Sequence, residues 1–280
     1  MKPDWLKIKL EGNETFPKIR RIVERHHLHT ICSSGRCPNI GRCWSRGTAT
    51  FMILGDICTR SCRFCATQTG RPTPPDADEP QKIAESIRLM QLRHCVITSV
   101  DRDDLPDKGA EHWAKTIRVI RTLNPCIIIE VLIPDFDADT ALLDAVMAAQ
   151  PDVIGHNLET VERLTPQVRS RAGYGRSLDV LRYMAQQGGM TKSGIMVGLG
   201  ERPEEVVATM HDVRAAGVQL FTIGQYLQPT ARHIPVAEYV HPSQFDYYKQ
   251  TGIEIGFRNI ESGPLVRSSF MADEQLAIDY

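Results

Sequence analysis

The feature that most constrains the fold is a regular alternation between short apolar, β-branched segments and amphipathic segments. Ile83, Ile87 and Met90 recur at the spacing of one helix face. The segments expected to be strands are 51–54, 95–100, 127–133, 153–154, 194–199 and 218–223; those expected to be helices are 80–93, 111–123, 140–149, 178–187 and 203–215. Such alternation predicts a parallel α/β sheet with right-handed crossovers. Six units, two fewer than a closed barrel, predict a partial, about three-quarter TIM-type barrel, with the tail from Gln225 covering a sheet edge.

The composition is that of a globular chain with few ways to bind nucleic acid or membranes. Of 280 residues, 42% are hydrophobic and 24% charged, which is enough apolar material for a sizeable core. The net charge of −1 argues against a nucleic-acid partner that needs a basic footprint. No apolar run approaches the roughly 18 residues of a membrane span, and residues 1–7 show no signal-peptide pattern. We therefore expect a cytoplasmic protein without a membrane partner.

Six of the eight cysteines form two triplets within the 34 residues from Cys32 to Cys65. The triplets are Cys32, Cys37 and Cys43, separated by four and five residues, and Cys58, Cys62 and Cys65, separated by three and two. Disulfides are disfavoured in the reducing cytosol for a chain with a core of this size. A structural zinc site remains open, because His26, His27 and His29 could complete a set of four ligands. Cys95 and Cys126 lie in apolar stretches, and we assign them no role.

An iron–sulfur cluster suits the triplets better than zinc does. A cubane cluster has four iron corners, and three thiolates leave one iron open to a small chelating molecule. Phe64, directly before Cys65, would add an aromatic face beside the open iron.

Polar or glycine residues follow each expected strand, at the sheet edge where barrels of this kind place their chemistry. These positions are Asp56, 99–101, Asp135, 156–159, 198–201 and 224–226. Any single one is more simply a strand cap. Six in succession beside a cysteine loop favour a ligand-lined mouth, in which the glycine-rich segment 194–200 would let an adenine approach the backbone.

Several motifs resemble known families. The second triplet, with its aromatic residue before the last cysteine, resembles the signature of the radical S-adenosylmethionine (radical SAM) superfamily. Nearly the whole chain resembles the lipoyl synthase family, in segments 49–65, 99–105, 156–160, 192–201, 222–229 and 262–269. Phe270 departs from the tyrosine usual after the second serine of the Arg267, Ser268, Ser269 element.

The resemblance implies a radical SAM partial barrel with two extensions. An N-terminal extension, 1–48, would carry the auxiliary-cluster cysteines, residues 49–226 the barrel, and a C-terminal extension, 227–280, the element Arg267–Ser269. It also implies a sulfurtransferase that inserts two sulfur atoms at C6 and C8 of a protein-bound octanoyl-lysine. Hydrogen abstraction by a 5′-deoxyadenosyl radical would open each C–H bond, since no side-chain base can deprotonate an unactivated alkyl carbon.

The cofactors implied are two 4Fe-4S clusters and S-adenosylmethionine. Cys58, Cys62 and Cys65 would hold the cluster that binds S-adenosylmethionine, while Cys32, Cys37 and Cys43, with Ser269 as fourth ligand, would hold the auxiliary cluster that donates sulfur. Both ligand sets, Ser269 included, would thereby be catalytic. For the S-adenosylmethionine pocket we predict Phe64, Ser99, Asn157, Glu159, Lys192 and Met196. Asn157 and Glu159 suit ribose hydroxyls or the methionine amine, and Lys192 suits a carboxylate.

The partners implied are an octanoylated lipoyl carrier, a ferredoxin- or flavodoxin-type reductant and an iron–sulfur carrier that rebuilds the spent cluster. The lipoyl carrier would be a glycine cleavage H protein or the E2 lipoyl domain of a 2-oxoacid dehydrogenase. Two alternatives stay open: another sulfur-inserting radical enzyme similar to biotin synthase, and a non-catalytic iron–sulfur electron carrier. The first would lack the Cys32 triplet with its terminal serine, and the second rarely needs a barrel.

Overall fold

The computed structural model describes residues 2–7, 15–25, 28–34, 37, 39–45, 48–270 and 272–275. Of the histidines considered as zinc ligands, His26 and His27 lie outside these residues. The chain divides into two compact units. The N-terminal unit comprises Lys9–Arg60 and Thr67–Ile154; the C-terminal unit comprises Met1–Ile8, Ser61–Ala66 and Gly155–Tyr280.

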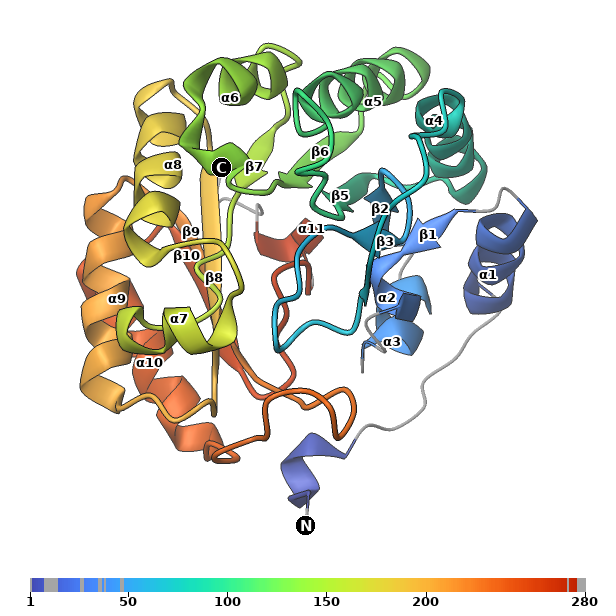
Figure 1. Ribbon diagram of the computed structural model, residues 1–280. Helices are drawn as coiled ribbons and strands as arrows, with labels where there is room; N and C mark the ends of the chain where they lie inside the picture. The colour runs from blue at the N-terminus through green and yellow to red at the C-terminus, as the bar shows by residue number, and fades with distance from the viewer. Residues whose placement is uncertain are drawn as a thin grey trace. The chain divides into compact units, whose positions relative to one another are not determined.

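The N-terminal unit is a parallel sheet covered by helices. Strand β1 (His29–Thr30) pairs antiparallel with β2 (Thr50–Ile53), and β2, β5 (His94–Ser99) and β6 (Ile128–Leu132) pair in parallel. Helices α4 (Glu79–Met90), α5 (Ala110–Leu123) and α6 (Thr140–Met147) pack side by side outside these strands (Figure 1). All four residues of β2 are buried, which makes it a central strand of the core.

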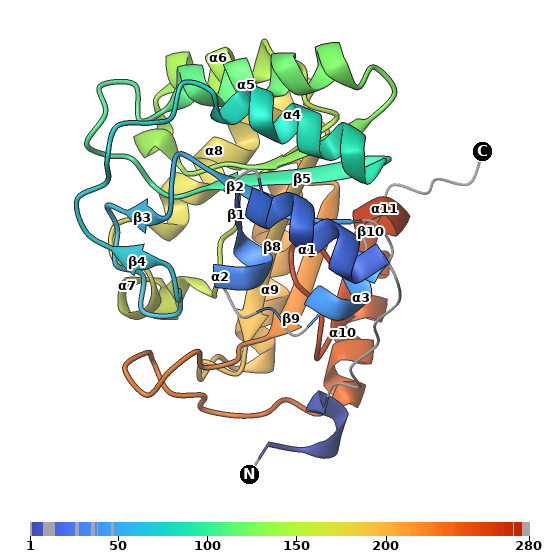
Figure 2. The same ribbon diagram turned by 90° about the vertical axis from the view of Figure 1, so that its right-hand side faces the viewer.

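Shorter elements of this unit surround the cysteines. Helix α1 (Thr15–Arg25) packs against α3 (Ile40–Ser45) and α4 (Figure 2), and α2 (Ile31–Ser34) precedes α3 in the chain. Strands β3 (Ile57–Cys58) and β4 (Gln68–Thr69) form a separate parallel pair. A 3₁₀ turn, η2 (Phe136–Ala138), follows β6, and β7 (Val153–Gly155) runs into the C-terminal unit.

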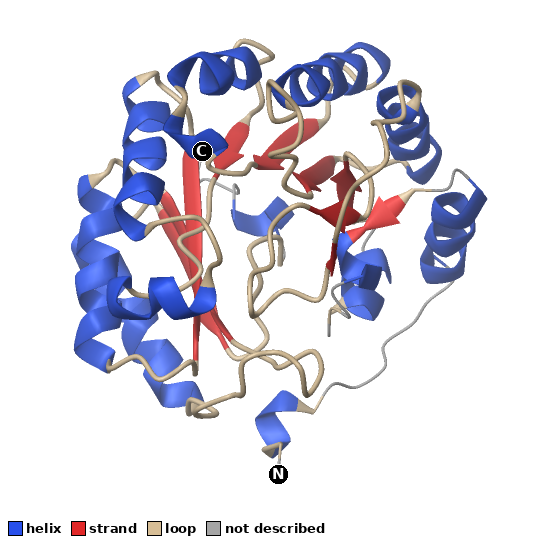
Figure 3. Ribbon diagram, viewed as in Figure 1, coloured by secondary structure: helices blue, strands red, loops and turns tan. Residues whose placement is uncertain are grey.

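The C-terminal unit is also a parallel sheet with helices outside it. Strands β8 (Thr191–Val197), β9 (Leu220–Gln225) and β10 (Asn259–Gly263) pair in that order. Helices α8 (Tyr174–Gln186), α9 (Pro203–Ala215) and α10 (Pro242–Ile255) lie along their outer side (Figure 3). The short elements are η1 (Asp4–Leu6), η3 (Glu162–Leu164), α7 (Thr165–Val168) and α11 (Ala272–Gln275). Trp5 of η1 packs edge-on against His241, which caps α10, with ring centroids 5.3 Å apart.

The six expected strands, β2, β5, β6, β7, β8 and β9, and the five expected helices, α4, α5, α6, α8 and α9, are confirmed along the chain. The tail also covers a sheet edge as expected, because β10 pairs with β9. Helix α10 and strand β10 themselves are not among the expected elements, and α8 begins at Tyr174, four residues before the expected start. The division into an N-terminal extension (1–48), a barrel (49–226) and a C-terminal extension (227–280) was based on the expected functions of these segments. It stays a prediction.

Candidate functional site

The first cysteine triplet lies on two short helices and the turn between them. Cys32 is a buried residue of α2, Cys43 belongs to α3, and Cys37 lies between the two helices. The main-chain N–H of Cys37 donates to the Cys32 carbonyl at 3.0 Å, and the Cys43 carbonyl accepts from the N–H of Thr48 at 3.0 Å. Burial, and then the nearby Cys37, raise the pKa of the Cys32 thiol. Binding to a metal as thiolate would require the loss of this proton.

Cys58 of the second triplet ends β3 in the N-terminal unit, and two main-chain donors surround its sulfur. The N–H of Asp101 donates to Cys58 Sγ at 3.3 Å and the N–H of Arg60 at 3.4 Å. N–H donors of this kind stabilise the thiolate form in which cysteine binds iron. The thiol also donates to Asp101 Oδ2 at 3.6 Å. Metal binding would displace this proton and leave the sulfur with its two N–H donors, which fits a cluster ligand.

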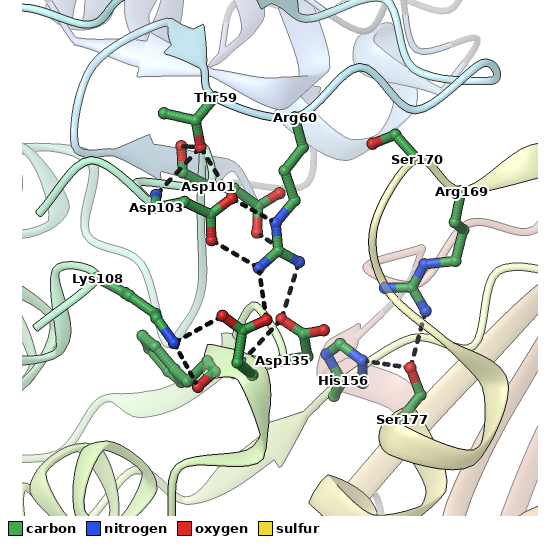
Figure 4. Close-up of polar contacts among 12 residues, drawn as sticks. Thr59, Arg60, Asp101, Asp103, Lys108, Asp135, His156, Arg169, Ser170 and Ser177 are labelled. Atoms are coloured by element: carbon green, nitrogen blue, oxygen red, sulfur yellow. Dashed lines mark hydrogen bonds and ion pairs between the residues drawn. The ribbon is translucent and has the colours of Figure 1, made fainter.

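A buried arginine links the Cys58 loop to the ends of two strands (Figure 4). Arg60, whose side chain is 4% exposed, donates from Nε and Nη2 to the two carboxylate oxygens of Asp103, both at 2.8 Å. Its Nη1 lies 2.8 Å from Oδ1 of the fully buried Asp135 and 3.4 Å from Oδ1 of Asp101. Lys108 donates to Asp137 at 2.8 Å and thereby adds a second cation to this group of aspartates.

The loop that carries Cys58 leaves β2 through a left-handed turn. Leu54 has a φ of 68°, which is unusual for a branched side chain. Its N–H donates to the buried Glu79 carboxylate at 2.8 Å, and its carbonyl accepts from Nη1 of Arg102 at 3.1 Å. A Cβ at Gly109 would lie 2.6 Å from the Leu54 side chain, so glycine leaves room for it there. The start of the cluster loop is therefore fixed from both sides.

The C-terminal unit holds the rest of the triplet, Cys62 and Cys65, through main-chain contacts. The N–H of Arg63 donates to the Val168 carbonyl at 3.0 Å, and the Arg63 carbonyl accepts from Ile234 at 3.1 Å. Nε2 of His233 contacts the Cys65 carbonyl at 2.9 Å, and Ser170 Oγ lies 3.8 Å from Cys62 Sγ. Phe64, between these cysteines, is half-buried.

Four of the predicted pocket residues lie together in the C-terminal unit. Lys192 and Met196 alternate with neighbours along β8 and so share one face of that strand with Gly194. Asn157 lies against this face, since its Oδ1 is 3.4 Å from the position of a Cβ at Gly194. Its Nδ2 donates to Glu159 Oε1 at 3.1 Å, and Glu159 itself bridges to Ile195 of β8. Burial raises the pKa of Glu159, while the cation of Arg169 opposes this shift.

Ser99, the remaining predicted pocket residue, lies at the end of β5 in the N-terminal unit. Its hydroxyl is buried and has no hydrogen-bond partner among the described residues. Such a group costs free energy unless a ligand satisfies it, which fits a binding role.

The element Arg267–Ser269 lies in the C-terminal unit, where the chain directly before it passes close to a glycine of the sheet. A Cβ at Gly224 of β9 would collide with the Val266 carbonyl, so only glycine admits the chain there. Arg267 then donates from Nη1 to the Gln225 carbonyl at 3.0 Å, and the Phe270 N–H closes a turn on the Arg267 carbonyl at 2.9 Å. Ser268 Oγ accepts from Asn157 Nδ2 at 3.3 Å. The element that contains Ser269 therefore touches the Asn157 and Glu159 group directly.

All eight cysteines lie within the described part of the chain, and each is a free thiol there. Nowhere among the described residues do three or more histidine, cysteine or carboxylate side chains converge as a single metal ion requires. A mononuclear zinc site needs such convergence. A cubane cluster takes one thiolate at each iron, and its ligands lie further apart.

A model of the radical SAM superfamily matches residues 52–213. Lipoyl synthase of Parabacteroides distasonis is 61% identical over 275 residues, which cover 98% of each chain. Lipoyl synthase of Bacteroides thetaiotaomicron is 62% identical over the same length, with 98% of each chain covered. The mitochondrial lipoyl synthase of Nematostella vectensis is 55% identical, over 98% of this chain and 95% of its own.

The chain belongs to the lipoyl synthase family. As a lipoyl synthase it is a radical SAM sulfurtransferase that uses two 4Fe-4S clusters and S-adenosylmethionine. The biotin synthase and electron-carrier alternatives are thereby set aside.

Solved structures agree on the α/β radical SAM fold. Methylornithine synthase has a TM-score of 0.56 at 11% identity, covering 95% of this chain and 88% of its own. Streptococcus suis SuiB bound to S-adenosylmethionine has a TM-score of 0.61 at 9% identity, covering 80% of this chain and 54% of its own. At such identities the likeness concerns the fold alone. In this lipoyl synthase no described helix is long and apolar enough to cross a membrane.

The sequence places Asp101 and Asp135 among the polar strand ends, but it assigns no role to Arg60 or Asp103 and does not predict that these residues meet. Arg60 and the aspartates at 101, 103 and 135 belong to three strand ends, and only the fold brings them together. The charged run 101–104 was a signal, but its spacing alone does not say which cation it meets. Gly224 was noted only as part of a strand end. The requirement for glycine there comes from the Val266 carbonyl, which belongs to a segment more than 40 residues away in the sequence.

Proposed function

We propose that the two cysteine triplets of this lipoyl synthase have separate tasks. Cys58, Cys62 and Cys65 would hold the cluster at which S-adenosylmethionine binds. Cys32, Cys37 and Cys43, with the Ser269 oxygen as fourth ligand, would hold the auxiliary cluster that supplies sulfur. The pair of N–H donors on Cys58 Sγ is the observation that best supports the first assignment. In this division 1–48 and 227–280 are the extensions that bring the auxiliary ligands to the barrel, 49–226.

The pocket residues would bind S-adenosylmethionine by complementary chemistry. Glu159 and Asn157 present a carboxylate and an amide, which suit ribose hydroxyls or the methionine amine. Lys192, 3% exposed on β8, would oppose the methionine carboxylate. Phe64 and Met196 would add apolar contacts, and the buried Ser99 hydroxyl would gain its missing hydrogen bond. Bound at the reduced cluster, S-adenosylmethionine supplies the radical chemistry that an unactivated C–H bond requires.

The substrate we propose is an octanoyl-lysine on a lipoyl domain, thiolated at C6 and C8. The carrier would be a glycine cleavage H protein or the E2 lipoyl domain of a 2-oxoacid dehydrogenase. Because the auxiliary cluster is consumed, an iron–sulfur carrier must rebuild it, and a ferredoxin- or flavodoxin-type protein would deliver electrons. The absence of disulfides among the eight cysteines supports a reducing, cytoplasmic location.

The function is tested by incubating the reconstituted protein anaerobically with S-adenosylmethionine, dithionite and an octanoyl-lysyl peptide. Mass spectrometry should find two sulfur atoms added to the peptide, together with 5′-deoxyadenosine. Deoxyadenosine without sulfur on the peptide would refute either the octanoyl substrate or the auxiliary donor. Neither product, from protein that holds its clusters, would refute the proposal as a whole.

A further inference from the structure

The segment that follows β5, Asp101–Asp104, has no task in the function derived so far. It runs beside the loop of Cys58 and joins it through a series of hydrogen bonds. The Thr59 N–H donates to the Asp101 carbonyl at 3.0 Å, and the Thr59 hydroxyl donates to the same carbonyl at 2.9 Å. In return, the Asp103 N–H donates to Thr59 Oγ1 at 3.1 Å. The Asp101–Asp104 segment therefore holds the loop at Thr59, the residue directly after Cys58.

Arg60 fastens the same two segments from the other side. Its guanidinium grips Asp103 with two parallel bonds of 2.8 Å, a geometry that fixes direction as well as distance. Asp135, at the end of β6, holds Nη1 at 2.8 Å and has no exposed surface. A buried guanidinium held by carboxylates from two other segments, Asp103 and Asp135, has little freedom to move (Figure 4).

These contacts converge on one atom, the Cys58 sulfur. Its two main-chain donors belong to Arg60 and Asp101, which are the residues that the network fixes. At 3.3 and 3.4 Å, both N–H groups lie within hydrogen-bonding distance of the sulfur, and their direction toward it depends on how the loop and the Asp101–Asp104 segment are held. The Asp101 N–H reaches the sulfur only while the Asp101–Asp104 segment stays against the loop. The Arg60 N–H reaches it from within the loop, two residues from Cys58, in the conformation that the Arg60 side-chain contacts hold.

We propose that Arg60 is a positioning residue that, with Thr59 and Asp103, fixes the two N–H donors on Cys58 Sγ and so sets the reduction potential of the cluster that Cys58 holds. This inference rests on the proposed assignment of Cys58 to the S-adenosylmethionine cluster. Hydrogen bonds to cluster sulfurs are one of the factors that set such potentials. They favour the reduced cluster, because reduction adds electron density to its sulfurs, and so raise the potential.

The test uses substitutions that keep the charge of the loop unchanged. Arg60→Lys retains the cation but not the planar fork that binds Asp103. Thr59→Val retains the side-chain shape but removes the hydroxyl that ties the loop to the Asp101–Asp104 segment. Arg121→Lys is the matched control, since Arg121 also binds an aspartate (Asp152, 2.6 Å) and a main-chain carbonyl in the same unit. These two contacts of Arg121 involve neither the Cys58 loop nor the Asp101–Asp104 segment.

The measurement is a dithionite titration of the full-length holoenzyme, followed by electron paramagnetic resonance. The cluster of interest is the one whose reduced signal changes when S-adenosylmethionine is added afterwards. Only preparations with wild-type iron content are compared, so that loss of fold or cluster does not imitate a shift. We expect a more negative midpoint potential in Arg60→Lys and Thr59→Val, and the wild-type value in Arg121→Lys.

Unchanged potentials in both loop variants would overturn the inference, as would an equal shift in Arg121→Lys. If Arg60→Lys does not retain iron, Thr59→Val decides by the same criterion. A wild-type protein whose reduced signals all ignore S-adenosylmethionine would instead refute the proposed cluster assignment, and the inference with it.

Discussion

At the scale of single residues, Ser269 carries the most specific expectation. An oxygen ligand is harder than a thiolate and should leave its iron more easily, which would favour release of sulfur from the auxiliary cluster. Ser269→Cys should therefore keep the iron content but slow sulfur transfer by about tenfold, or about 1.4 kcal/mol in the barrier. Iron analysis and peptide mass spectrometry measure the two quantities separately. Transfer at the wild-type rate would refute the lability of the serine ligand.

Glu159 should show opposite effects on stability and on binding. Burial raises the pKa of its carboxyl above the ordinary value of 4.5, so the folded protein binds this proton more tightly than the unfolded chain does. The free energy of unfolding therefore falls as the pH rises from 4.5 through the folded-state pKa. Glu159→Gln should remove this loss and be more stable than the wild type at neutral pH.

The same substitution should weaken S-adenosylmethionine binding by about tenfold, because a neutral amide replaces the carboxylate that we propose to accept a hydrogen bond from the ligand. Urea unfolding at several pH values and equilibrium dialysis check the two effects. Wild-type affinity in Glu159→Gln would refute a contact between Glu159 and S-adenosylmethionine. A lower free energy of unfolding than the wild type at neutral pH would refute the predicted gain in stability.

At the scale of elements, Gly224 of strand β9 leaves the space that the Val266 carbonyl occupies, directly before the Arg267–Ser269 element. Gly224→Ala should push the Val266 carbonyl away, destabilise the fold by about 1–3 kcal/mol, and reduce the iron bound at the Cys32 triplet. The matched control is Gly175→Ala in α8, where a Cβ meets nothing within 4 Å. It should leave iron content unchanged and raise stability by up to about 1 kcal/mol. Equal iron content in both variants would show that Gly224 does not position Ser269.

The elements also show what the sequence could predict. Apolar periodicity placed the strands β2, β5, β6, β7, β8 and β9 and the helices α4, α5, α6, α8 and α9 within a few residues, because each buries one defined face. The short elements β3, β4 and α7 were not predicted. Cysteine spacing identified both triplets, since ligand spacing is local. Strand β10, Asn259–Gly263, carries Asn, Glu, Ser and Gly around one buried isoleucine, and so lacks the apolar pattern of a strand. The Arg60 network and the Gly224 crossing depend on contacts between distant segments, which no local pattern records.

At the scale of the whole molecule, we propose that the two cysteine triplets of one chain hold clusters that act one after the other in the same reaction. The cluster proposed at Cys58, Cys62 and Cys65 would generate the radical, and the cluster proposed at Cys32, Cys37 and Cys43 would supply its sulfide to the substrate. The relatives of 61% and 62% identity are matched over 98% of their own length.

The most direct test of this claim compares two triple variants in the anaerobic assay with the octanoyl-lysyl peptide. Replacement of Cys32, Cys37 and Cys43 by alanine should leave about four iron atoms per chain and allow 5′-deoxyadenosine to form, without sulfur reaching the peptide. Replacement of Cys58, Cys62 and Cys65 should abolish both products while the other cluster remains. Sulfur insertion by the first variant, or deoxyadenosine from the second, would contradict the account.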